Sequence, residues 1–92
     1  YVVNNDDLNL LRIDPTTGNR TLLTGNQSPY SGPTFSVPTG IEVISPSEVL
    51  VTDSGQNAII RVDSSGNRSI LSGNPSIGNI GTGPSLDAPQ DV

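Results

Sequence analysis

The sequence repeats itself about once every 50 residues, and this repeat limits the possible folds more than any other feature. Leu10–Asp14 returns as Ile59–Asp63, and Gly18–Asn26 returns as Gly66–Asn74. Insertions and deletions fall in turns and loops, while apolar positions keep their chemistry. A structural repeat behaves in this way because each unit presents the same faces to its neighbours. Leu11 and its repeat equivalent Ile60 are therefore expected to match in burial and orientation.

One complete unit reads as four short strands. Bursts of Val, Ile and Leu lie between clusters of Gly, Pro, Asn and Ser, which is the pattern of strands joined by turns. Gly66 or Asn67 is expected to take a positive φ in the third turn. A long loop over residues 73–88 then leads to the next unit. The expected strands are Thr39–Ile44, Val49–Thr52, Ala58–Asp63 and Arg68–Ser72.

Four short antiparallel strands in about 50 residues are typical of one blade of a β-propeller. A β-sandwich does not need so close a repeat, and a β-helix usually has a shorter one. The sequence therefore predicts an all-β propeller segment with a circularly permuted start. Residues 1–37 supply strands two to four of one blade and an inter-blade loop, residues 38–88 a complete blade, and residues 89–92 the start of strand one of the next. Further copies are expected to complete the ring.

The composition excludes several classes of protein. Hydrophobic residues make up 32% of the chain, and the aromatic ones are Tyr1, Tyr30 and Phe35, so the core is expected to consist of Val, Ile and Leu. The net charge is −5 with four Arg and no Lys, which argues against nucleic acid and anionic membranes as partners. No apolar run approaches the roughly 18 residues of a membrane span.

The segment Val49–Asp63 resembles the centre of an NHL-type repeat, and Pro38–Val43 resembles the Pro-x-Gly-Ile-x-Val opening of such a blade. The wider resemblance is to six-bladed propellers of the NHL and gluconolactonase-like group, and it covers essentially the whole chain. Asn4–Asn9 departs from the Asp-x-Gly-x-Asn pattern of the family, and the loops are longer than its norm. These motifs are specific for the blade and not for an activity.

The resemblance also points to candidate ligands for a metal ion. Lactonase-like relatives hold a divalent cation with Glu, Asn and Asp from several blades, and such oxygen ligands suit Ca²⁺. The candidates are Asp53 and Asn57, with Asn4 and Asp7 as their repeat equivalents. The favoured interpretation is that Asp53 and Asn57 close a turn by binding backbone N–H groups. We therefore expect no metal, no cofactor and no catalytic residue in this chain.

The other acidic residues and arginines that recur in the repeat are expected to be structural. Asp14 and Asp63 follow the third strand of each unit and are interpreted as turn-opening residues. We expect the repeated arginines to pair across strands or between blades with Asp14, Asp63 or Glu48. These arginines are Arg12 with Arg61, and Arg20 with Arg68.

Further patterns argue against catalysis in this chain. The absence of His and Cys excludes imidazole and thiol catalysis within it. Gly25–Asn26 and Gly73–Asn74 lack the strand–loop–helix context and the Lys of a phosphate loop. Phe35 matches Leu86, which predicts a plug between blades.

We expect a non-enzymatic structural or interaction module of an extracellular or cell-surface protein. The alternatives are a fragment of a Ca²⁺-dependent lactonase-like hydrolase, and an engineered or excised fragment that assembles as an oligomer. The expected partners are further blades, from a homo-oligomer or from a longer chain, with a protein or glycan ligand. Three chains giving six blades is the expected closure. The triplets at Asn19, Asn26 and Asn67 matter only in a glycosylating pathway.

Overall fold

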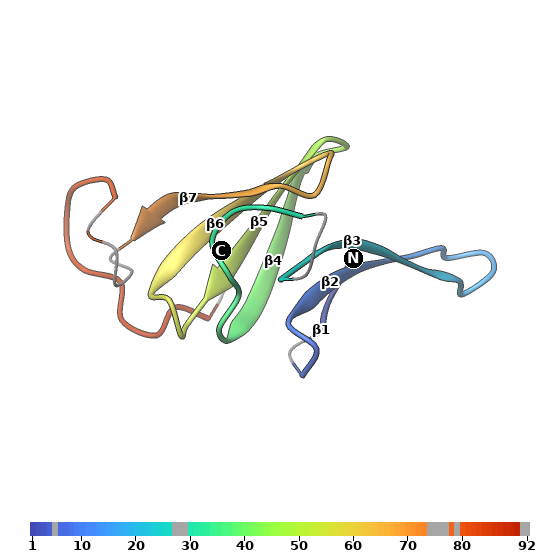
Figure 1. Ribbon diagram of the computed structural model, residues 1–92, viewed down its shortest axis with the longest axis horizontal. Helices are drawn as coiled ribbons and strands as arrows, with labels where there is room; N and C mark the ends of the chain where they lie inside the picture. The colour runs from blue at the N-terminus through green and yellow to red at the C-terminus, as the bar shows by residue number, and fades with distance from the viewer. Residues whose placement is uncertain (5, 27–29, 74–77, 79, 91–92) are drawn as a thin grey trace.

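The computed structural model describes residues 1–4, 6–26, 30–73, 78 and 80–90. Within these residues, seven strands form two antiparallel sheets in which the strands follow one another in chain order (Figure 1). No helix occurs among the described residues, so none of them forms a helix that could span a membrane. The first sheet holds β1 (Val2–Asn4), β2 (Asn9–Ile13) and β3 (Arg20–Gly25). The second sheet holds β4 (Pro38–Ser45), β5 (Glu48–Asp53), β6 (Ala58–Asp63) and β7 (Arg68–Gly73).

The all-β class and the four strands of the complete unit are confirmed. β6 has the predicted bounds, and β7 extends past Ser72 to Gly73. Pro38 begins β4, where its missing N–H costs no ladder bond. Glu48 was expected in the turn before the second strand, but it belongs to β5 and pairs with Ser45 and Asp63. The turn between β4 and β5 is therefore shorter than the sequence indicates.

Strand register confirms the sequence repeat. Asn4 pairs with Asn9 at the end of β1, and its repeat equivalent Asp53 pairs with Ala58 at the end of β5. The ladder between β2 and β3 is irregular after Leu10, and the ladder between β6 and β7 is irregular after Ile59, the repeat equivalent of Leu10. The first sheet therefore reproduces the last three strands of the second, including its irregularity.

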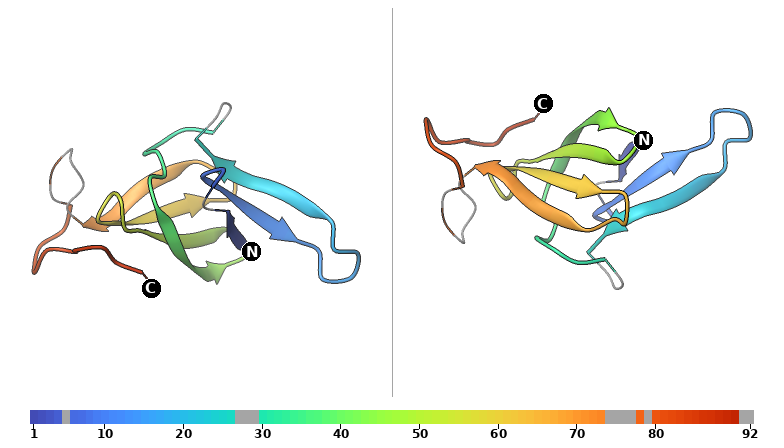
Figure 2. Two further views of the ribbon diagram at one scale, coloured as in Figure 1. Left: turned by 90° about the horizontal axis from the view of Figure 1, so that it is seen from below. Right: turned by 90° about the horizontal axis from the view of Figure 1, so that it is seen from above.

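The two sheets lie side by side, and their facing sides form the core. Figure 2 shows the β2–β3 hairpin extending beyond the second sheet at one end of the molecule, and the C-terminal segment at the other. β1 lies against β4 where the sheets meet. Phe35, from the loop between the sheets, is buried in the same core, which agrees with its predicted role as a plug. The buried apolar side chains are Leu10, Phe35, Val49, Val51, Ile60 and Val62, with Val3, Leu8, Leu23, Ile41 and Ile70 packed around them.

The burial predicted for one repeated pair is wrong. Leu11 is the repeat equivalent of Ile60 and was expected to match it in burial, but Ile60 is fully buried whereas Leu11 is only half-buried. Its neighbour Leu10 fills the core instead. Successive residues of a strand point to opposite faces, so the Ile60 side of the second sheet meets the Leu10 side of the first. The Leu11 side of the first sheet consequently faces outward.

Candidate functional site

Asp53 is the most highly bonded acidic side chain among the described residues, and it is fully buried at the end of β5. Its Oδ1 accepts hydrogen bonds from the backbone N–H groups of Val37 (2.8 Å), Gly55 (3.0 Å) and Gln56 (3.1 Å). Its Oδ2 accepts one from the N–H of Ser36 (2.7 Å). The carboxylate thus joins the loop before β4 to the turn between β5 and β6.

Asn57 does not share this arrangement. It has a positive φ of 51°, which Asn tolerates better than most residues, and its Oδ1 accepts the N–H of Ala88 (2.9 Å). The register aligns Asn57 with Leu8, which has a φ of 55°. The predicted equivalence of Asp7 with Asn57 is therefore wrong, because the match falls on the next position of the chain.

The candidate calcium ligands do not fit a calcium ion. The oxygens of Asp53 are bonded by four backbone donors, so a cation there would have to displace them. The Nδ2 of Asn4 donates to the Oδ2 of Asp7 (3.2 Å) on the exposed turn after β1. Across the part of the chain that the structure describes, no three acidic side chains gather as a metal-binding group. The interpretation of Asp53 as a turn-closing residue is confirmed.

Arg68 links the two sheets through neutral oxygens rather than through the predicted acidic partners. Its side chain is buried at the start of β7, and its Nε donates to the carbonyl of Pro33 (2.7 Å). Its Nη1 donates to Thr24 Oγ1 (2.7 Å) and to the carbonyl of Gly25. The guanidinium carbon lies 5.3 Å from the centre of the Phe35 ring, a cation–π contact. We call Thr24, Gly25, Pro33 and Phe35 the inter-sheet socket.

The inter-sheet socket removes much of the water around a positive charge. Desolvation lowers the pKa of Arg68 from its usual value, yet a guanidinium keeps its proton at neutral pH. Three charge-assisted hydrogen bonds compensate for this burial. Arg68 is therefore a positioning group that fixes the second sheet against the first.

Asn26 is a structural residue that the sequence pattern did not reveal. Its Oδ1 accepts the N–H of Phe35 (2.7 Å), and its Nδ2 donates to the Phe35 carbonyl (3.0 Å). Both amide atoms therefore hold the plug residue in place. The only signal was the recurrence of Asn after Gly in both units, at Gly25–Asn26 and Gly73–Asn74. Asn74 lies outside the described residues.

Arg61 forms one of the predicted ion pairs. Its Nε lies 2.9 Å from Oε1 of Glu48, and the two side chains are 47% and 35% exposed. A pair with this exposure stabilises a fold by about 0.2–1 kcal/mol.

Asp14 and Asp63 open their turns as predicted. Asp63 Oδ1 accepts the N–H groups of Ser65 (2.9 Å) and Asn67 (3.0 Å). Asp14 Oδ1 accepts those of Thr16 (2.8 Å) and Thr17 (3.3 Å). Each carboxylate therefore stabilises its own turn.

The Asp14 turn gives a pH-dependent prediction. The N–H groups of Thr16 and Thr17, with a smaller contribution from Arg12, hold the pKa of Asp14 below its usual value of 3.8. Because the folded state favours the ionised form, the Asp14 carboxylate stabilises the fold at pH values above its unfolded pKa. This stabilisation is lost as the pH falls through the lower, folded pKa. An NMR titration of the Asp14 carboxyl carbon, assigned with Asp14→Asn, should give a midpoint below that usual value. A midpoint at or above it would refute the role of these bonds.

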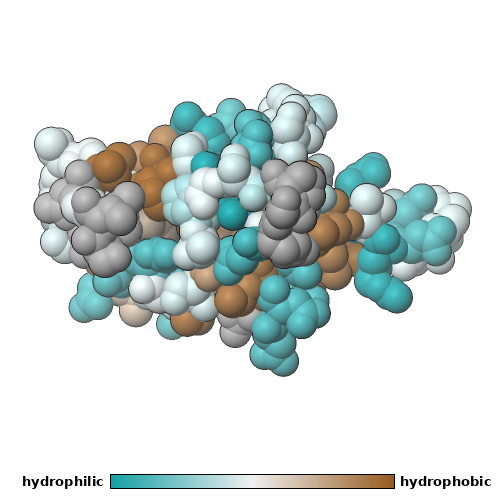
Figure 3. Space-filling model, viewed as in Figure 1, coloured by the Kyte–Doolittle hydropathy of each residue, from teal (hydrophilic) through white to brown (hydrophobic). Residues whose placement is uncertain are grey.

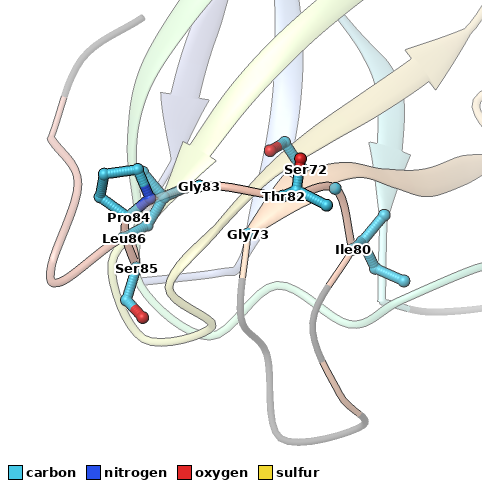
Figure 4. A pocket seen from close by; sticks show the side chains of 9 residues that line it. Ser72, Gly73, Ile80, Thr82, Gly83, Pro84, Ser85 and Leu86 are labelled. Atoms are coloured by element: carbon cyan, nitrogen blue, oxygen red, sulfur yellow. The ribbon is translucent and has the colours of Figure 1, made fainter.

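A pocket of about 300 Å³ lies at the far end of the second sheet, between the end of β7 and the following loop (Figure 4). We call it the terminal pocket. It is lined by Ser72, Gly73, Ile80, Gly81, Thr82, Gly83, Pro84, Ser85 and Leu86.

Comparisons with known proteins do not extend these observations. No protein-family model, no curated protein and no solved structure matches the chain.

Proposed function

We propose that the chain supplies two consecutive blades of a β-propeller and serves as a non-enzymatic structural and interaction module. The observation that carries this proposal is the relation between the two sheets. They keep one register, and they meet through opposite faces of the same repeat, with Leu10 on one side and Ile60 on the other. Blades of a propeller stack in this manner because every blade has one face for each neighbour.

The outer faces support additional stacking. On the outer side of the first sheet Val2 is 45% exposed, and Leu11 and Leu22 are half-buried. On the second sheet Leu71 is 37% exposed. Figure 3 shows separate apolar patches on the face in view, toward the left, right of the centre and along the lower edge. Repeat units with apolar outer faces need a neighbour on each side. We propose closure by three copies into six blades, in keeping with the resemblance to six-bladed propellers.

A contact near the end of the described chain supports the proposed start of a next blade. Thr39 Oγ1, at the start of β4, donates to the carbonyl of Pro89 (3.2 Å), and Pro89 is the repeat equivalent of Pro38. Successive first strands lie beside one another around a propeller. This contact supports the interpretation of residues 89–92 as the start of strand one, of which residues 91–92 lie outside the described part of the chain.

The non-enzymatic part of the proposal is supported by Asp53, the strongest calcium candidate. Its carboxylate is committed to backbone donors, and its position repeats as Asn4, whose amide bonds a neighbouring turn residue. The polar, Cys-free and Lys-free composition supports an extracellular or cell-surface location, with a protein or glycan as ligand.

A calcium titration separates this proposal from a lactonase-like hydrolase. Calorimetric titration of CaCl₂ into the protein should give no saturable heat, and simple aryl and aliphatic lactones should be hydrolysed no faster with the protein than without it. The reason is that binding at Asp53 would break four hydrogen bonds. Tight calcium binding that Asp53→Asn abolishes, together with calcium-dependent lactone hydrolysis, would overturn the non-enzymatic assignment.

A further inference from the structure

We propose that the terminal pocket receives the Arg20 side chain of a second copy of this chain. This inference rests on the proposed stacking of blades and names the residue that joins one copy to the next. The contact between the two sheets of one chain shows what such a junction looks like, because there Arg68 fills the inter-sheet socket.

The repeat maps the inter-sheet socket onto the terminal pocket. Thr24 and Gly25 correspond to Ser72 and Gly73, while Pro33 and Phe35 correspond to Pro84 and Leu86. All four equivalents line the terminal pocket (Figure 4). A hydroxyl, two backbone carbonyls and an apolar side chain are therefore present in both places, although Leu86 replaces the aromatic ring.

The loops that complete the two sites share a glycine with a positive φ at the equivalent position. Gly32 has a φ of +113°, and its equivalent Gly83 has a φ of +123°. A Cβ on Gly32 would lie 2.0 Å from the Arg68 carbonyl oxygen, so the loop runs directly against the arginine strand. Around Gly83 no described atom lies within 4 Å of the same position. The second loop is thus shaped for a strand like β7 and leaves room for its backbone.

Backbone and side-chain acceptors in the terminal pocket match those that Arg68 uses. Arg68 N–H donates to the Ser31 carbonyl (2.8 Å), and the equivalent of Ser31 is Thr82, which lines the terminal pocket. The Gly73 carbonyl already accepts the Ile80 N–H (2.8 Å). A carbonyl has two lone pairs, so it can also accept a guanidinium N–H, as the Gly25 carbonyl does.

Arg20 is the matching group on the opposite side of the chain. It begins β3 as its repeat equivalent Arg68 begins β7, and its side chain is exposed. It stands on the outward face of the first sheet with Leu11 and Leu22, the equivalents of Ile60 and Ile70. If the first sheet of one copy docks on the second sheet of another, the apolar face of the first sheet covers the outer face of the second. The same docking brings Arg20 to the terminal pocket.

The repeat also indicates which residue of a second copy would lie beside Asp87. Within the chain, Asp53 accepts the N–H of Ser36. The repeat places Asn4 at the position of Asp53 and Asp87 at the position of Ser36. A junction between copies would therefore set the Asn4 amide, rather than a second carboxylate, at the position that faces Asp87. An amide there avoids the repulsion between two adjacent carboxylates, which favours a second copy as the occupant.

Sedimentation velocity over a protein concentration series tests the proposal with three variants. Arg20→Ala removes the inserted side chain, and Ser72→Arg fills the terminal pocket with a like charge. Arg12→Ala is the matched control, because Arg12 is another exposed arginine of the first sheet but does not correspond to Arg68. We expect Arg20→Ala and Ser72→Arg to weaken association at least about tenfold, while Arg12→Ala leaves it unchanged.

Mixing the two weakened variants makes the test directional. Each retains one intact partner surface, so an equimolar mixture of Arg20→Ala and Ser72→Arg should form a dimer through one intact junction, at a lower concentration than either variant associates alone. If the wild-type chain assembles and Arg20→Ala assembles equally well, the arginine assignment is overturned while the proposed stacking stands. A wild-type chain that stays monomeric overturns both. Circular dichroism of each variant confirms that its strands are retained.

Discussion

Replacing Asp53 by Ala should destabilise the protein by about 3 kcal/mol or more. The change leaves four backbone N–H groups, those of Ser36, Val37, Gly55 and Gln56, without their acceptor. A fully buried donor without its acceptor costs about 1–3 kcal/mol, and these four bonds are partly buried, so water reaching the loop recovers part of this loss. Urea unfolding followed by circular dichroism at one fixed protein concentration measures the difference.

Asp63→Ala is the matched control for this prediction. Asp63 also ends a strand and also accepts backbone N–H groups, but it is exposed, so water replaces the lost acceptor. We expect a loss of about 0.5–1.5 kcal/mol for this variant. Equal losses for Asp53→Ala and Asp63→Ala would show that the four hydrogen bonds of Asp53 do not hold the loop between the sheets.

Ile60→Ala should cost about 2–5 kcal/mol, because Ile60 is fully buried where the two sheets meet. Leu11→Ala, at the equivalent position of the first sheet, removes a half-buried side chain and should cost clearly less in a dilute, unassembled chain. Once copies associate, the Leu11 face becomes buried, and the cost of Leu11→Ala should rise toward that of Ile60→Ala. Urea unfolding at low and high protein concentration measures both costs.

The concentration dependence is the decisive part of that comparison. A Leu11→Ala cost that stays constant as the protein concentration rises would contradict burial of the outer face of the first sheet. An Ile60→Ala cost below about 1 kcal/mol would contradict the stacking of the sheets itself.

Much of the fold could be predicted because turns and strands are local. Alternation of Val, Ile and Leu between Gly and Asn turns was enough to place β6 with its observed bounds. The repeat then assigned the shorter first sheet, whose strands contain fewer residues to judge. Local chemistry also identified Asp14, Asp53 and Asp63 as residues that bind the N–H groups of turns.

The contacts between sheets could not be predicted in the same way. A repeat states which residues are equivalent, but Leu11 and Ile60 differ in burial because only one of them faces another sheet. For the same reason Arg68 was expected to meet an acidic side chain, whereas it meets carbonyl groups and a hydroxyl from the preceding unit. The misalignment of Asp7 arose in a turn, where the register was visible only through strand pairing.

The mass of the wild-type protein in solution tests the central claim most directly. Size-exclusion chromatography with multi-angle light scattering, from low to high micromolar concentration, should show a folded, β-rich particle with the mass of three 9.5 kDa chains. The reason is that each chain has two apolar outer faces and a single internal junction, and repeat arrays generally need three or more units. A folded, soluble 9.5 kDa monomer at low micromolar concentration would contradict the account.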